Sequence, residues 1–212
     1  MSAGSRPNEY GLVAPETAMR MSGLELLQAM VNGALPGPLI AQTADFWIAE
    51  VEKGRIIFEG MPSMKFYNPL GTVHGGWISA ILDSAMGCAV HSTLTAGQTY
   101  TTTSMTIHFV RPVFETTGKV RCEGVAVHGG SRLATSEARL WDEAGKLLAH
   151  GSEACLVMTN APASRLTNLD GSSRRCRSAC DEMTIGLLER DWFSRRNRDA
   201  SSLVIPAQAG NQ

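Results

Sequence analysis

The stretch His74–Val90 reads HGGWISAILDSAMGCAV, and it decides the fold. Between Trp77 and Val90 the only charged residue is Asp83, and apolar or small residues surround it in every direction around a helix. A helix with this composition is buried on most of its sides. The stretch therefore predicts a long, central, buried helix over residues 74–93 that carries one carboxylate.

Asp83 has no helical neighbour that can neutralise its charge. The residues three and four positions away are Ser79, Ala80, Met86 and Gly87. Burial of an unpaired carboxylate costs several kcal/mol, so the position calls for a reason. One interpretation is structural, with a backbone N–H or an Arg from elsewhere satisfying the carboxylate. The other is a general base or nucleophile in a water-poor cleft.

The beginning of the same helix has a second chemical feature. Gly75 and Gly76 follow His74, and glycines there leave backbone N–H groups accessible. The helix dipole favours negative charge at this end, which suits an oxyanion hole at a carbonyl substrate. A tight turn is the alternative interpretation. The glycines and Asp83 lie about two helical turns apart.

The rest of the central region predicts a helix at 22–32 and a series of strands. Short turns join most of the strands, and short turns require antiparallel neighbours. One antiparallel sheet against one long helix is an α+β arrangement. In the first strand after the helix, alternation places Met105, Ile107 and Phe109 on one face, which predicts core positions. The expected strands are 43–51, 55–61, 100–110, 119–128, 133–141 and 147–158.

Length, charge and cysteine usage limit the class of protein. A chain of 212 residues with a net charge of −1 suggests one domain and argues against a dedicated nucleic-acid binder. Its five cysteines follow no framework spacing, which favours reduced thiols and a cytoplasmic location. No apolar run reaches the roughly 20 residues of a membrane span, so we expect no membrane association.

Three short motifs together resemble the PaaI-like branch of the hotdog-fold acyl-CoA thioesterases. They are Asn68–Gly76 (NPLGTVHGG), Leu82-Asp83 on the helix, and Ile107–Pro112 (IHFVRP). The resemblance covers residues 21–160. It implies a hotdog fold, an antiparallel sheet wrapped around one long central helix, in a homodimer or homotetramer with the active site between subunits.

Two segments lie outside the resemblance. Residues 1–20 are expected to form an N-terminal tail. Residues 161–212 hold eight Arg and no Lys against six acidic residues, and are expected to be largely disordered with a short helix near 181–193.

The resemblance also implies residue roles. Asp83 matches the catalytic carboxylate that activates water or attacks the thioester, and Gly75 matches the residue whose N–H polarises the thioester carbonyl. Asn68 and His74 match positions that orient the substrate and its loop. Thr102 matches a Ser/Thr position, contributed by the partner subunit, that holds the water or the carboxylate.

The chemistry of the substrate completes the expected site. A thioester is already an activated acyl group, so hydrolysis needs neither a metal nor a cofactor beyond the coenzyme A of the substrate. The phosphates of coenzyme A call for Arg or Lys, and Arg111 and Arg132 are candidates beside the alternative of ordinary surface arginines. Gly76 and Ser131 are further substrate-binding candidates.

Two other functions remain open at the level of sequence. A hotdog enoyl-CoA hydratase or dehydratase would pair a catalytic His with an acid, and His74 is available. A non-catalytic acyl-CoA binding protein would bind the ligand without turnover. The Leu82-Asp83 pattern fits a thioesterase better, although it does not fix the acyl chain length or the choice between nucleophile and general base.

Overall fold

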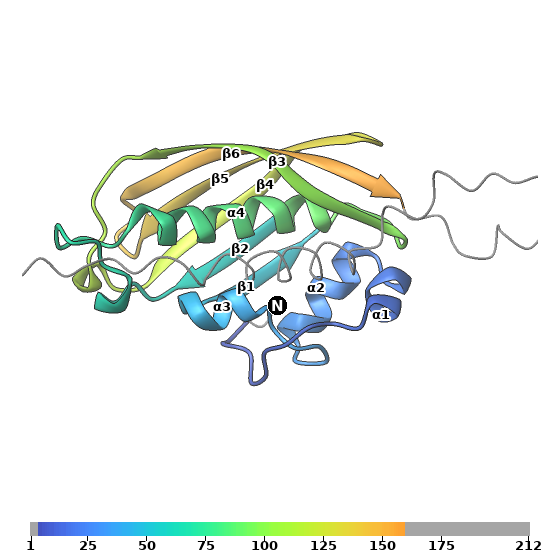
Figure 1. Ribbon diagram of the computed structural model, residues 1–212, viewed down its shortest axis with the longest axis horizontal. Helices are drawn as coiled ribbons and strands as arrows, with labels where there is room; N and C mark the ends of the chain where they lie inside the picture. The colour runs from blue at the N-terminus through green and yellow to red at the C-terminus, as the bar shows by residue number, and fades with distance from the viewer. Residues whose placement is uncertain (1–3, 160–212) are drawn as a thin grey trace, which may run out of the picture. The chain divides into compact units, whose positions relative to one another are not determined.

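One long helix lies against one face of a six-stranded antiparallel sheet in the computed structural model, which describes residues 4–159 (Figure 1). The strand order is β1-β2-β4-β5-β6-β3, and every adjacent pair is antiparallel. This confirms the predicted α+β fold with a sheet wrapped around a central helix. The helix is α4 (Gly75–His91), and the strands are β1 (Phe46–Glu52), β2 (Arg55–Gly60), β3 (Gln98–Phe109), β4 (Val120–Gly129), β5 (Leu133–Asp142) and β6 (Leu147–Thr159).

Helix α4 provides the centre of the core. Nine of its 17 residues are buried, and Ile81, Leu82 and Ala85 are fully inaccessible. It passes so close to β4 that a Cβ on Gly124 would lie 2.1 Å from the carbonyl oxygen of Ala85. The apolar helix is therefore seated directly on the sheet backbone, as its composition requires.

Three short helices precede the sheet: α1 (Pro15–Arg20), α2 (Gly23–Val31) and α3 (Leu39–Ala44). Helices α2 and α3 pack beside α4 at the β1 edge, where Trp77 Nε1 donates to the carbonyl oxygen of Ala44 at 2.6 Å. The predicted helix at 22–32 is confirmed as α2, whose Ser22 and Glu25 form a reciprocal capping box. The sequence did not predict α3, and the strand expected from residue 43 begins at Phe46. Asp45, in the left-handed conformation with φ of 54°, ends α3 and turns the chain into β1.

The segment 4–20, assigned from sequence to a tail, contacts the folded unit. The N–H of Gly4 donates to the carbonyl oxygen of Ala49 at 2.7 Å. Arg6 pairs with Asp45 at 2.9 Å and lies over the ring of Trp47. These contacts join positions about 40 residues apart, which local sequence patterns do not reveal. The expected tail at 161–212 and its helix at 181–193 lie outside the described residues.

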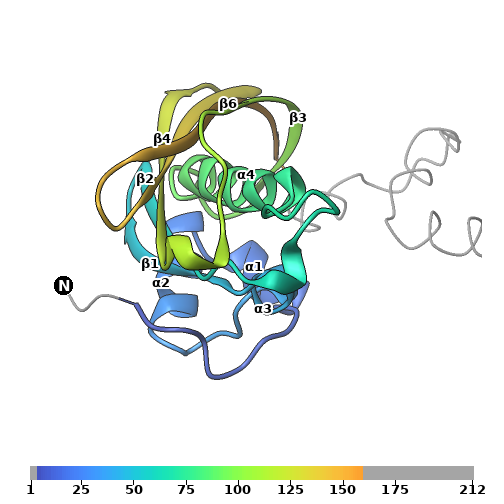
Figure 2. The same cartoon turned by 90° about the vertical axis from the view of Figure 1, so that its left-hand side faces the viewer.

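Strand β3 is an edge of the sheet and pairs only with β6 among the described strands (Figure 2). Its residues 101–106 are all exposed in the single chain. Met105 is 39% and Phe109 54% exposed, so the prediction that they belong to the core of this chain is wrong. Alternation identified one face of the strand correctly but did not tell what covers it. An open edge of this length is a template for pairing with another strand.

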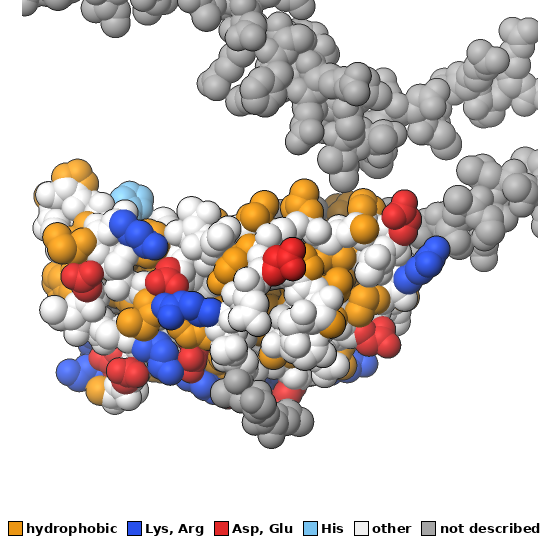
Figure 3. Space-filling model, turned by 90° about the horizontal axis from the view of Figure 1, so that it is seen from below, with side chains coloured by type: hydrophobic (Ala, Val, Ile, Leu, Met, Phe, Trp, Pro, Cys, Tyr) orange, Lys and Arg blue, Asp and Glu red, His pale blue; other side chains and the backbone are white. Residues whose placement is uncertain are grey.

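The face of α1–α3 shows a different surface. Figure 3 views the molecule from this side, where hydrophobic side chains are interspersed with charged ones. Leu12, Leu39 and Ile40 are exposed there or in the adjoining segments, and scattered apolar side chains of this kind are ordinary. Within residues 4–159 no helix is both long and apolar enough to cross a membrane.

The contact between α4 and β4 gives a stability prediction. Gly124→Ala places a methyl group against helix backbone that cannot move alone, so we expect a loss of about 1–3 kcal/mol or more in the free energy of unfolding. The matched control is Gly129→Ala on the same strand, where the nearest atom to the new Cβ is 4.0 Å away. Urea unfolding measures both variants. Equal stability of the two would contradict the close seating of α4.

Candidate active site

The N-terminus of α4 leaves one backbone N–H available. His74 is the N-cap, and its Nδ1 accepts a hydrogen bond from the N–H of Gly76 at 2.8 Å. The N–H of Trp77 donates to the carbonyl oxygen of His74. The N–H of Gly75 has no hydrogen-bond partner in the part of the chain that the structure describes. Of the two predicted glycines, Gly75 is therefore the available donor, and the Gly76 N–H is occupied by the cap.

The loop before α4 is shaped by Asn68. Its Oδ1 accepts from the N–H of Leu70 at 2.9 Å and of Thr72 at 3.3 Å, and its Nδ2 donates to Thr72 Oγ1 at 2.9 Å. The loop then joins the body through the N–H of His74, which donates to the carbonyl oxygen of Phe66. Asn68 thus acts on the loop that delivers His74 and Gly75 rather than pointing freely into solvent.

Asp83 is half-buried on α4, two turns further along, and lacks a counter-charge. No Lys or Arg within residues 4–159 makes an ion pair with it. Its Oδ1 lies 3.4 Å from the hydroxyl Oγ1 of Thr102, and its carboxyl group also interacts with that of Glu153. The resemblance implied that Thr102 comes from the partner subunit, but here it belongs to the same chain as the Asp83 that it contacts. The structural interpretation that an Arg neutralises Asp83 finds no support in these residues.

A second carboxylate that sequence reasoning missed lies beside Asp83. Glu153 on β6 is 3% exposed, and its Oε1 is 2.9 Å from both Thr102 Oγ1 and Cys155 Sγ. Burial raises the pKa of Glu153, and the nearby negative charge of Asp83 raises it further, against the lowering effect of its two hydrogen bonds. The signal was available, because β6 alternates and Glu153 shares its buried parity with Gly151 and Cys155.

Cysteine thiols and a tyrosine also lie near the two carboxyl groups. Burial raises the pKa of Cys88 and of Cys155 to about 12 in each case, and the charges of Asp83 and Glu153 add to the effect. Burial likewise raises the pKa of Tyr100 well above 10. Each of these groups is thus held in its neutral form in an environment that disfavours negative charge.

Gly75 and Asp83 of one chain are too far apart to act on one carbonyl group. They are eight residues apart on a continuous helix, which corresponds to about 12 Å along its axis at 1.5 Å per residue. A thioester carbonyl and an attacking water need donors and base within hydrogen-bond reach of the same few atoms. A single chain therefore contains two halves of a site, at different points of α4.

The predicted arginines lie near opposite ends of β3. Arg111 follows the end of β3 and donates to the carbonyl oxygen of Leu147. Arg132 lies in the β4–β5 turn, where its carbonyl oxygen accepts a hydrogen bond from the N–H of Val157. Val157 pairs with Tyr100, so Arg132 lies near the beginning of β3. The Arg132 side chain is exposed, as is Ser131 beside it.

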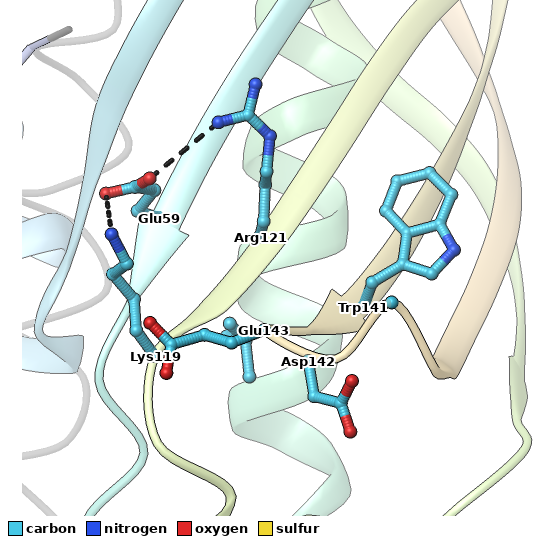
Figure 4. Close-up of a pocket in the computed structure, with 8 residues that line it drawn as sticks. Glu59, Lys119, Arg121, Trp141, Asp142 and Glu143 are labelled. Carbon is cyan, nitrogen blue, oxygen red and sulfur yellow. Dashed lines mark hydrogen bonds and ion pairs between the residues drawn. The ribbon is translucent and has the colours of Figure 1, made fainter.

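A surface pocket of about 500 Å³ lies elsewhere and includes none of the predicted residues. Figure 4 shows its charged lining, in which Glu59 pairs with Lys119 at 3.1 Å and with Arg121 at 3.7 Å. The cationic groups of this pocket are thus already engaged by carboxylates. Among residues 4–159, no three His, Cys, Asp or Glu side chains gather closely enough to hold a metal ion.

Comparisons with known proteins agree with the fold. The family described as the thioesterase superfamily matches residues 70–149, which include the Gly75 and Asp83 positions. A phenylacetic acid degradation-related protein from Ralstonia eutropha is 27% identical, with a TM-score of 0.57 over 61% of this chain and 98% of that one. No curated protein sequence matches the chain.

Two more distant structures show the fold alone. The Escherichia coli PaaI protein is 18% identical, with a TM-score of 0.57 over 66% of this chain and 96% of that one. A Streptococcus mutans protein bound to acetyl-CoA is 22% identical, with a TM-score of 0.51 over 56% of this chain and 92% of that one.

The fold is that of the hotdog proteins, and residues 70–149 match the thioesterase superfamily. The chain resembles the PaaI-type phenylacetic acid degradation proteins, and the matched family supports a thioester hydrolase.

The raised thiol pKa values give a prediction about reactivity. In a background with Cys176 and Cys180 changed to Ser, the folded protein at pH 8 should react with a disulfide reagent far more slowly than the unfolded protein. The reason is that only the thiolate is nucleophilic, and burial suppresses it at Cys88, Cys122 and Cys155. Release of the coloured thiol, with and without denaturant, measures the difference. Rapid modification of the folded protein would contradict the burial of this cluster.

Proposed function

We propose that this protein hydrolyses an acyl-CoA or aryl-CoA thioester to a free carboxylate and coenzyme A, with Asp83 as the catalytic carboxylate. The observation that supports this most is a half-buried Asp83 without a cation, in contact with the Thr102 hydroxyl. Within residues 4–159 no cation explains the position of this carboxylate, whereas a reaction that needs a base explains it.

The chemistry follows from the groups at hand. In the general-base form of the reaction, Asp83 takes a proton from a water molecule as its oxygen attacks the thioester carbonyl carbon. Negative charge develops on the carbonyl oxygen, which the free N–H of Gly75 and the helix dipole stabilise. The C–S bond then breaks, and the thiolate of coenzyme A takes the proton. In the alternative form, Asp83 attacks the carbonyl itself and water hydrolyses the resulting anhydride.

The distance along α4 supports a site shared between two copies of the chain. Because Gly75 and Asp83 of one chain lie about 12 Å apart, we assign the oxyanion donor to one subunit and the carboxylate to its partner. The open edge of β3 offers the surface through which two copies can pair as a homodimer. A homotetramer would be built from such dimers.

A site shared between two subunits also affects where coenzyme A would bind. Arg111 near the Gly75 end of one chain and Arg132 of the other become candidates for a shared phosphate site, with Ser131 beside Arg132. The exposed guanidinium of Arg132 is the better candidate, since Arg111 is already bonded to the Leu147 carbonyl oxygen. The Streptococcus mutans protein with the same fold binds acetyl-CoA, which supports a ligand of this class.

Thiol release from short, medium, long and aromatic acyl-CoA substrates tests the activity. We expect hydrolysis of at least one of them, and a loss of about 100-fold or more in kcat for Asp83→Asn, which keeps the shape but not the charge. Glu137→Gln, an exposed carboxylate on β5, is the matched control. A wild-type protein inactive on every substrate would overturn the proposal, and an active Asp83→Asn would remove Asp83 from the mechanism.

Mixed dimers test the shared site. Gly75→Pro removes the proposed oxyanion donor and suits the backbone, because Pro is favoured at the first helical position and His74 already has the extended conformation that precedes Pro. Its Cβ would lie 3.3 Å from the ring of Phe109, a half-exposed side chain that can shift. Gly75→Pro and Asp83→Asn should each be inactive alone. Refolded together in equal amounts, they should recover about a quarter of wild-type activity, since half of the dimers then have one complete site out of two.

A site within one chain predicts the opposite result. Neither variant then supplies an intact site to the other, and the mixture stays inactive. Size-exclusion chromatography of each variant checks that both remain assembled and folded.

A further inference from the structure

Glu153 has the environment of a functional group rather than of a surface carboxylate. It projects from β6 toward α4, it is 3% exposed, and its Oε2 has no hydrogen-bond partner in the described residues. The residue opposite on β5 is Ser136, whose buried hydroxyl also lacks a partner there. Two buried polar atoms without hydrogen bonds in one cross-strand pair reduce the stability of the fold, so their presence here needs an explanation.

The Thr102 hydroxyl lies between two carboxyl groups but has one hydrogen to donate. Its Oγ1 is 2.9 Å from Glu153 Oε1 and 3.4 Å from Asp83 Oδ1. The contact with Asp83 is weak unless the Thr102 hydroxyl hydrogen points toward Asp83. If both carboxyl groups are ionised, Thr102 satisfies one of them at the expense of the other. If Glu153 is protonated, its O–H can donate to Thr102, and Thr102 can donate to Asp83.

Of the groups that face Glu153, the charge of Asp83 disfavours its ionised form, whereas the hydrogen bonds from Thr102 and Cys155 favour it. The groups that face it are Asp83 and Cys88 from α4, Tyr100 and Thr102 from β3, and Cys155 from β6. No Lys or Arg of the described residues is among them. Burial, the largest effect, raises the pKa of Glu153 above its ordinary 4.5, and the charge of Asp83 acts in the same direction.

We propose that Glu153 is a positioning residue for Asp83, and that the two carboxyl groups share one proton through the Thr102 hydroxyl. This rests on the proposed function of Asp83. The proton resides on Glu153, so the chain of hydrogen bonds runs from Glu153 to Thr102 and from Thr102 to Asp83. The Asp83 carboxylate is thereby fixed in direction for its reaction.

The arrangement has a consequence for pH. When Glu153 loses its proton, it becomes the stronger acceptor and takes the Thr102 hydrogen away from Asp83. The orientation of Asp83 is then lost, and a second like charge enters the cleft. The rate should therefore fall on the alkaline side through an ionisation that belongs to Glu153 and Asp83 as a pair.

Carboxyl-carbon NMR of the full chain, titrated with pH, tests the shared proton without reference to activity. We expect Glu153 to titrate above 4.5 in the wild type, and at a lower pH in Asp83→Asn, where the like charge is gone. The matched control is Glu137→Gln, which should leave the Glu153 titration unchanged. A Glu153 that titrates identically in wild type and Asp83→Asn would overturn the shared proton.

The kinetic test compares Glu153→Gln with Glu153→Ala on the substrate that the acyl-CoA panel identifies. Glu153→Ala removes the support of Thr102, and we expect a loss of about tenfold in kcat with little change in KM. Glu153→Gln retains an N–H donor for Thr102, so it should restore part of kcat and abolish the alkaline fall. Glu153→Gln should also be more stable than the wild type at pH 8 but not at pH 4, because a raised folded-state pKa costs stability as pH rises.

The outcomes separate the two proposals. Inactivity of the wild type on all thioesters overturns the thioesterase function, while a coupled NMR titration still supports the proton-sharing pair. An active enzyme whose pH profile and kcat are the same in Glu153→Gln, Glu153→Ala and wild type overturns the role of Glu153 and leaves the function standing.

Discussion

The burial of one uncompensated carboxylate in an apolar helix is the constraint on which the structure depends. Helix α4 lies at the centre of the core, and Asp83 interrupts its apolar surface without an ion pair in the described residues. Isolated buried charge is destabilising, so a fold optimised only for stability would place an apolar residue there. Around it lie Thr102, Glu153 and Cys155 from the sheet and Cys88 from α4 itself.

The second constraint is the length of the helix. Its N-terminus offers a free N–H at Gly75, and its middle carries the carboxylate, but the separation of about 12 Å keeps them from meeting within one chain. The open edge of β3 and its exposed Met105 and Phe109 are of the kind that association covers. Fold and chemistry thus lead to the same expectation, that two copies of the chain complete each other's site.

Much of this was visible in the sequence, since the decisive signals are local. The lone charge in an apolar run identified Asp83, and the Ser22 capping box and the turn before Arg55 located a helix and a hairpin. Glu153 was missed because a single acidic residue in a strand is ordinarily exposed, and only the parity of the buried positions on β6 shows otherwise. Met105 was misassigned because alternation defines a face but not what covers that face.

Contacts between distant segments were beyond the reach of sequence patterns. The ion pair between Arg6 and Asp45 joins the N-terminal segment to the fold. The His74 side chain accepts a hydrogen bond from the N–H of Gly76, which leaves the N–H of Gly75 as the available donor. Both depend on the three-dimensional arrangement of the chain rather than on the local order of residue types.

A crystal structure of the protein with a ketone analogue of an acyl-CoA, in which a methylene group replaces the sulfur, tests the central claim most directly. The account predicts the carbonyl oxygen within hydrogen-bond distance of the Gly75 N–H of one subunit. It also predicts that the carbonyl carbon faces Asp83 of the partner subunit. An analogue bound away from Asp83, or a carbonyl group held entirely within one chain, would contradict it.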